Sequence, residues 1–162
     1  MAFTSRWLQI GILVGNGLWS STLSASLTIN VTGVVVEGQC EVNGGETIYV
    51  DFGRNLQSQL INGERFMQTI NYSLACEDLT SNDLEMQFEG TATGFSDDYL
   101  ATDRDGLGIK IYIDGAVMPL NQWMPFTWPA IPVLQAAPIK MDGTEVETGI
   151  FSASATMKIQ YQ

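Results

Sequence analysis

The sequence predicts an all-β protein that folds as an antiparallel sandwich. Short segments of alternating apolar and polar residues recur along the chain, and a period of two is typical of half-buried strands. Turn-forming pairs such as Asp105-Gly106 and Asp114-Gly115 separate these segments. No segment carries a helical apolar period over more than two turns, and the chain has no internal repeat. Short strands at regular spacing favour a sandwich over a fold that contains long helices.

Residues 1–25 have the pattern of a secretory signal peptide. Arg6 is the only charged residue among the first 36, an apolar stretch covers residues 7–19, and small residues follow it. Glycines interrupt the apolar stretch, which is shorter than the roughly 20 residues that a membrane-spanning helix needs. A cleaved signal is therefore favoured over a membrane anchor, and cleavage after Ser24 or after Ala25 fits the pattern. The sequence predicts an exported protein.

Residues 27–35 predict an amphipathic strand at the start of the mature chain, with no obvious partner. Its polar side chains lie on one face, and Gly33 interrupts the apolar row on the other, where a neighbouring chain could approach closely. Such a strand near a free terminus can add itself to the sheet of another molecule. The alternative is an ordinary edge strand of a complete sandwich. The row consists of Leu27, Ile29, Val31, Gly33 and Val35.

The remaining strands follow in order along the chain. Apolar residues alternate with polar ones in each, and the last strand carries its apolar residues on a single face. The proline-rich segment 119–138, which contains Trp123 and Trp128, is expected to be a loop-rich edge region. The expected strands are 47–52, 65–76, 84–88, 107–113 and 150–161.

Charge and cysteine content restrict the partners and the compartment. The chain has 18 acidic and 7 basic residues, a net charge of −11, and the acidic residues are spread along it. A surface of this sign repels phosphate backbones and anionic lipids, which excludes nucleic acid and membrane surfaces and suits a basic partner. In an exported protein, Cys40 and Cys76 are expected to form one disulfide, with two buried thiols as the alternative. Their spacing does not match a zinc site.

The residues offer no catalytic, metal or cofactor site. The chain has no histidine, so a serine or cysteine nucleophile lacks its commonest base, and the scattered acids identify no glycosidase pair. The acidic segment 103–106 lacks the glutamate that ends a calcium-binding loop. The alternative to a structural role is sugar binding in a complete sandwich, with stacking on Trp123, Phe126 and Trp128.

The two ends of the chain, taken together, resemble pilins of the chaperone–usher pathway. Gly149 is the fourteenth residue from the C-terminus and Tyr161 is the penultimate one, with alternating apolar residues between them. The strand 27–35 looks like the donor strand of these pilins. The block 43–53 looks like the strand that follows the first cysteine in minor tip subunits of P and type 1 pili. The resemblance covers the mature chain.

The resemblance implies an immunoglobulin-like sandwich that lacks its seventh strand, with a donor extension at 26–37 and a pilin domain at 38–162. The periplasmic chaperone would fill the groove first and anchor the C-terminal carboxylate. At the outer-membrane usher, a neighbouring pilin's donor strand would replace it, and the subunit would reach a cell-surface fimbria. The short segment before the donor strand favours a minor tip adaptor, with a shaft or terminating subunit as alternatives. The acceptor strand would comprise Gly149, Phe151, Ala153, Ala155, Met157, Ile159, Tyr161 and Gln162.

Overall fold

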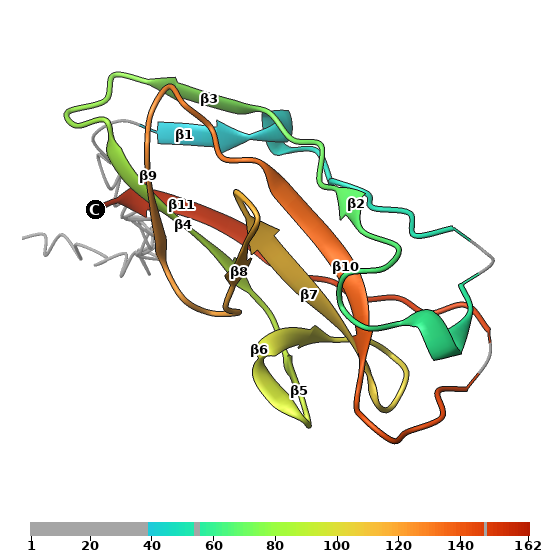
Figure 1. Ribbon diagram of the computed structural model, residues 1–162. Coiled ribbons are helices and arrows are strands. Elements are labelled where there is room, and N and C mark those ends of the chain that lie inside the picture. The colour runs from blue at the N-terminus through green and yellow to red at the C-terminus, as the bar shows by residue number, and fades with distance from the viewer. Residues whose placement is uncertain (1–38, 54–55, 148) are drawn as a thin grey trace, which may run out of the picture. The chain divides into compact units, whose positions relative to one another are not determined.

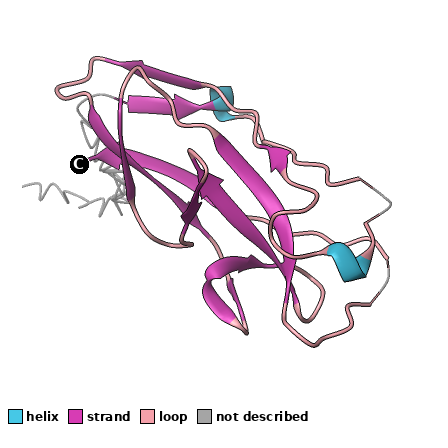
Figure 2. Cartoon of the chain, in the orientation of Figure 1, coloured by secondary structure: helices cyan, strands magenta, loops and turns pink. Residues whose placement is uncertain are grey.

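The computed structural model describes residues 39–53, 56–147 and 149–162. Figure 2 shows that these residues form strands and loops, with helical geometry only in the 3-10 turns η1 (Asn43–Gly45) and η2 (Ser58–Leu60). The prediction of an all-β fold is confirmed. The predicted signal peptide and donor strand lie outside the described residues.

The strands form three antiparallel groups (Figure 1). The largest sheet has the order β2-β10-β7-β6-β5, and β8 also pairs with β7. A second sheet has the order β11-β4-β9, and β1 pairs with β3. The bounds are β1 (Gln39–Val42), β2 (Gln68–Thr69), β3 (Leu74–Glu77), β4 (Asp83–Glu89), β5 (Ala92–Thr93), β6 (Ser96–Ala101), β7 (Leu107–Ile113), β8 (Ala116–Met118), β9 (Met124–Thr127), β10 (Leu134–Lys140) and β11 (Thr156–Tyr161).

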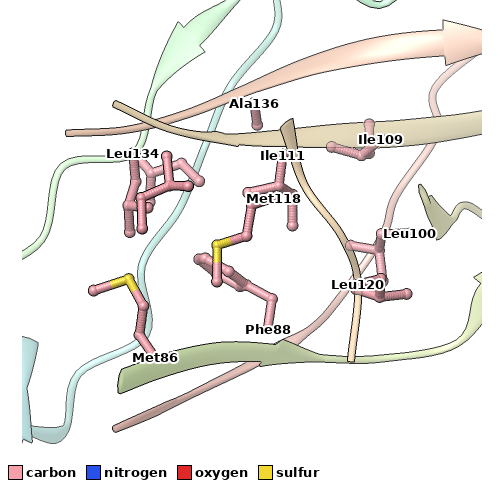
Figure 3. Close-up of a cluster of buried hydrophobic side chains, with 11 residues drawn as sticks. Met86, Phe88, Leu100, Ile109, Ile111, Met118, Leu120, Leu134 and Ala136 are labelled. Carbon is pink, nitrogen blue, oxygen red and sulfur yellow. The ribbon is translucent and has the colours of Figure 1, made fainter. Parts of the chain in front are cut away.

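The hydrophobic core lies between β4 and the pair β7 and β10, as Figure 3 shows. Buried residues alternate with more exposed ones along β4, and β7 is buried on both faces. On the outer face of β7, the Tyr112 hydroxyl donates to the carbonyl of Gly63. This bond shows that loop backbone covers that face. The predicted strands 84–88 and 107–113 are confirmed. The labelled core side chains are Met86, Phe88, Leu100, Ile109, Ile111, Met118, Leu120, Leu134 and Ala136.

The predicted loop-rich edge at 119–138 is wrong for its C-terminal part. β10 begins within it and lies between β2 and β7, in the interior of the larger sheet. Proline is tolerated in this strand because the backbone of Pro138 points away from β7. Its carbonyl accepts the N–H of Gly63, so its missing N–H removes no bond to β7. β2 pairs with β10 only at Gln135 and Ala136, which leaves that side of Pro138 free of a strand.

The predicted strand 65–76 is divided into β2 and β3. The division has a topological cause, because β2 pairs with β10 whereas β3 pairs with β1. Tyr72 lies between them and donates its hydroxyl to the carbonyl of Pro132. Burial, aided by the carboxylate of Asp114, raises the pKa of Tyr72 to about 12, so this phenol stays protonated to a higher pH than an exposed tyrosine.

Truncation of Met86 is expected to destabilise the fold strongly. Its side chain is 0% exposed in the core cluster, and Met86→Ala should lower the free energy of unfolding by about 2–5 kcal/mol. Glu85→Ala changes the adjacent residue of β4, whose side chain faces the other way and accepts a hydrogen bond from Gln160 Nε2, and should cost only about 0.5–1.5 kcal/mol. Urea unfolding of both variants measures the difference, and equal losses would contradict this placement of the core.

Candidate strand-acceptor groove

A groove of about 670 Å³ opens into the hydrophobic core between two extended segments. Residues 46–52, which follow η1, form the first lip, and residues 151–157, which lead into β11, form the second lip. The floor consists of core side chains from several strands, so the interior of the sandwich is open along this line. The floor residues are Ile70, Phe88, Leu100, Ile109, Ile111 and Ala136.

The backbone of both lips is extended, and apart from Thr156 and Met157 of the second lip it lies outside the sheets. Among the described residues, 47–52 belong to no strand, and no hydrogen bond joins the first lip to the second. The β11–β4 ladder begins only at the pair Thr156–Glu89, although the predicted strand covers 150–161. The predicted strands 47–52 and 150–161 are thus corrected to an extended lip and to a half-length strand. A strand placed between the lips could supply ladder partners to both.

Side chains on the first lip alternate between half-buried and exposed positions, and the residues of the second lip alternate between apolar and small polar types. Ile48, Val50 and Phe52 of the first lip are half-buried against the core cluster. Tyr49, by contrast, is 88% exposed. On the second lip Phe151 and Met157 pack against the same cluster. This alternation is that of a β-strand, so both lips present an apolar row to the empty space between them.

The two lips meet at one point. The rings of Phe52 and Phe151 stack across the groove with centroids 6.1 Å apart. Small residues follow on the second lip, where Ala153 and Ala155 leave room above the floor. A Cβ added at Gly90 would lie 2.6 Å from Leu100 Cδ1 and 3.5 Å from Ala155 Cβ. The absent side chain of Gly90 therefore lets the second lip lie close to the core.

The turn between β6 and β7 holds the start of the second lip. Arg104 Nε and Nη2 donate to the carbonyl of Ile150 at 3.2 and 3.0 Å, and Nη1 pairs with Glu147 Oε2 at 3.1 Å. Asp103 Oδ1 accepts the Ser152 N–H at 2.8 Å, and the Asp103 N–H donates to the Ser152 carbonyl at 3.0 Å. The Ser152 N–H, as the main cause, lowers the pKa of Asp103 below its usual value.

The predicted acceptor residues divide between the groove and the sheet. Phe151, Ala153, Ala155 and Met157 line the groove. The others occupy the ladder and its two ends, beyond the groove. Ile159 and Tyr161 pair with Met86 and Leu84, the Gln162 N–H donates to Asp83, and Gly149 lies against Arg104.

The acceptor residues predicted from the sequence include none from the first lip. Alternation of Ile48, Val50 and Phe52 was visible, but a period of two does not say that the neighbouring strand is absent. The predicted disulfide is confirmed, because Cys40 and Cys76 lie opposite each other in β1 and β3 and are bonded. The residues predicted to donate, 27–35, lie outside the described part of the chain.

The aromatic cluster considered for sugar binding does not form one exposed face. Phe126 packs against the core cluster, and Trp123 and Trp128 are half-buried. Within the described ranges, no group of three histidine, cysteine or acidic residues is placed to hold a metal ion. No helix in those ranges has the length and apolar character to cross a membrane.

Comparison of the sequence identifies relatives over most of the chain. The family model described as "Fimbrial protein" matches residues 29–162. The fimbrial-like protein YfcR of Escherichia coli (strain K12) is 32% identical over 160 residues, which cover 94% of this chain and 92% of YfcR. The fimbrial adapter PapF of Escherichia coli is 29% identical over 106 residues, covering 65% of this chain and 62% of PapF.

Comparison of the structure gives the same fold. The P pilus rod subunit PapA matches with a TM-score of 0.64 at 18% identity, covering 78% of this chain and 100% of PapA. The P pilus adaptor subunit PapF matches with a TM-score of 0.55 at 22% identity, covering 76% of this chain and 95% of PapF. The fold is thus the incomplete immunoglobulin-like sandwich of pilin subunits.

Proposed function

This chain belongs to the fimbrial protein family and is a pilus subunit of the chaperone–usher type, and we propose that its groove accepts a β-strand from a partner molecule. The observation that carries the proposal is the opening of the core between two extended lips that no hydrogen bond joins to each other among the described residues. The family is one of structural subunits, not of enzymes.

The groove has the chemistry that an amphipathic strand requires. Alternate apolar side chains of an inserted strand would lie over the floor, and its backbone would bond to the lips on both sides. Burial of four large aliphatic side chains gives about 6–12 kcal/mol before ordering costs, at ~1.5–3 kcal/mol each. A subunit that exposes this surface is expected to need a partner strand from export onwards.

Membership of the family indicates which strands are expected to fill the groove. A periplasmic chaperone is expected to fill the groove first and to contact the C-terminal carboxylate of Gln162. At the outer-membrane usher, the donor strand of a neighbouring pilin would replace the chaperone. The apolar row of residues 27–35 would enter the groove of another subunit in turn, and the assembled fimbria would lie at the cell surface.

A minor adaptor position near the pilus tip is favoured within this class. The donor strand begins almost at the predicted cleavage site, and relatives named as a fimbrial adapter and as minor fimbrial proteins support the assignment. A shaft or terminating position would use the same groove chemistry. The sugar-binding alternative has less support, because Phe126 is part of the core packing.

Filling the groove is expected to abolish strand binding. Ala155→Trp places a large ring over the floor, whereas Gln160→Trp places the same ring on an exposed residue of β11 that does not line the groove. A fluorescent peptide of residues 26–37 should bind the unaltered chain and Gln160→Trp, and binding to Ala155→Trp should fall by on the order of 100-fold, the equivalent of about 2.7 kcal/mol. Fluorescence anisotropy measures each affinity.

Gly33→Asn in the peptide provides the matched donor-side control. An asparagine side chain would add bulk to the apolar row, so the altered peptide should not bind. Equal binding of the peptide to the unaltered chain and to Ala155→Trp would refute the groove as the acceptor. Equal binding of the two peptides would refute the assignment of Gly33 to the donor row.

A further inference from the structure

We infer that Asp103 and Arg104, in the turn between β6 and β7, are positioning residues that hold the second lip ready for the incoming strand. The inference rests on the proposed function of the groove. The clamp is defined as the two residues Asp103 and Arg104, which bond to the backbone of Ile150 and Ser152. Neither clamp side chain lines the groove, so both would act through the lip.

The clamp binds the part of the C-terminal segment that precedes the β11–β4 ladder. β11 is fixed to β4 only from the pair Thr156–Glu89 onwards. In the described residues 150–155, the backbone hydrogen bonds are made by Ile150 and Ser152, and their partners are the two clamp residues. An extended segment without neighbours loses backbone conformational freedom when it is ordered, and this loss has a free-energy cost. The clamp orders part of the lip in the empty chain, so less backbone freedom is left to be lost when a partner binds.

The clamp also fixes which backbone groups face the partner. In an extended chain the N–H and C=O of one residue point to the same edge, and successive residues alternate. The carbonyl of Ile150 and both polar backbone groups of Ser152 point to the clamp, and the N–H of Gln162 points to β4. The intervening Phe151 and Ala153 must therefore direct their N–H and C=O groups into the groove. Their side chains line it as well.

Two local features keep the clamp in place. The hydroxyl oxygen of Thr102 accepts the Arg104 N–H at 3.1 Å and the hydroxyl donates to the carbonyl of Leu107 at 2.9 Å, which orders the turn. Gly149 has φ +132°, and a Cβ there would lie 3.3 Å from Arg104 Nη2. A larger residue at position 149 would be strained and would push against the guanidinium. The glycine fourteenth from the C-terminus thus has a physical role in this chain.

Loss of the clamp should slow strand capture more than strand release. Once a donor strand is paired to the second lip, the lip is ordered by its new ladder, so the clamp matters most in the empty groove. Arg104→Met keeps the aliphatic stem but removes the donors to Ile150. We expect it to slow association of the labelled 26–37 peptide by on the order of tenfold, the equivalent of about 1.4 kcal/mol, with dissociation changed less than about twofold.

Stopped-flow anisotropy on the exported full chain measures both rates. Lys158→Met is the matched control, because it removes the ion pair with Glu89 from the part of the same strand that the ladder already holds. Arg104→Lys retains the charge and one donor and should show an intermediate rate. Hydrogen exchange adds a structural measurement, in which Arg104→Met should speed exchange of the Ser152 amide in the empty chain, while peptide binding protects the Phe151 and Ala153 amides.

The outcomes distinguish the role of the clamp from the proposed function of the groove. No peptide binding by the unaltered chain would refute the proposed function with this strand. Binding by the unaltered chain at a rate that Arg104→Met and Arg104→Lys both retain would overturn the clamp alone. A slower rate in Lys158→Met equal to that in Arg104→Met would also overturn it, since any charge loss along the strand would then have the same effect.

Discussion

Residues 25–37 appended to the C-terminus of residues 38–162 through a flexible linker are expected to raise the melting temperature strongly. The appended strand can turn back along the second lip and lie between the two lips, where its apolar row covers the open floor of the core. An increase of even a few kcal/mol in the free energy of unfolding, after the cost of ordering the strand, raises the melting temperature by on the order of 10 °C. Thermal unfolding followed by circular dichroism compares the extended and unextended chains.

The control for this experiment carries Gly33→Asn within the appended strand. It has the same length, linker and apolar content, and should give little of the gain. Equal and high melting temperatures with and without the appended strand would mean that the sandwich is already complete, which contradicts the acceptor proposal. Stabilisation by the strand of another pilin, but not by residues 25–37, would identify a subunit that accepts only a different partner.

The sequence carried enough information to predict strands that have a partner within the chain. Strict alternation in 84–88 and 107–113 corresponds to β4 and β7, because burial of one or both faces selects the residue types in them. Cys40 and Cys76 were predicted as a pair from compartment alone, and the pair is bonded. Four of the predicted acceptor residues, from Phe151 to Met157, line the groove.

Features that depend on tertiary neighbours were not predictable. Pro138 is typical of an edge strand, yet β10 lies inside the sheet. The side of Pro138 that lacks an N–H faces the loop at Gly63, whose N–H donates to the Pro138 carbonyl. The first lip looked like an ordinary strand because a period of two records which face is buried and not which edge is paired. The clamp residues Asp103 and Arg104 looked like an acidic turn, and only the fold brings them to Ile150 and Ser152.

Removal of the disulfide is expected to damage both the fold and the groove. Cys40 of β1 is bonded to Cys76 of β3, and β1 continues through η1 directly into the first lip. Loss of a native disulfide from a small exported domain costs about 2–5 kcal/mol. The double variant Cys40→Ala/Cys76→Ala should show this loss in urea unfolding. It should also bind the 26–37 peptide more weakly, because only the hydrogen bonds between β1 and β3 then hold the start of the first lip.

The two effects separate when the disulfide is removed from a chain whose groove is already filled. An appended donor strand that enters the groove would tie the first lip to the second through backbone bonds, and would so replace part of the constraint that the disulfide supplied. The double variant should therefore lose less stability in the strand-complemented chain than in the empty chain. Equal losses in both chains would mean that the disulfide stabilises β1 and β3 alone and has no influence on the lip. A smaller loss in the complemented chain would show that the disulfide and the donor strand act on the same segment, residues 46–52.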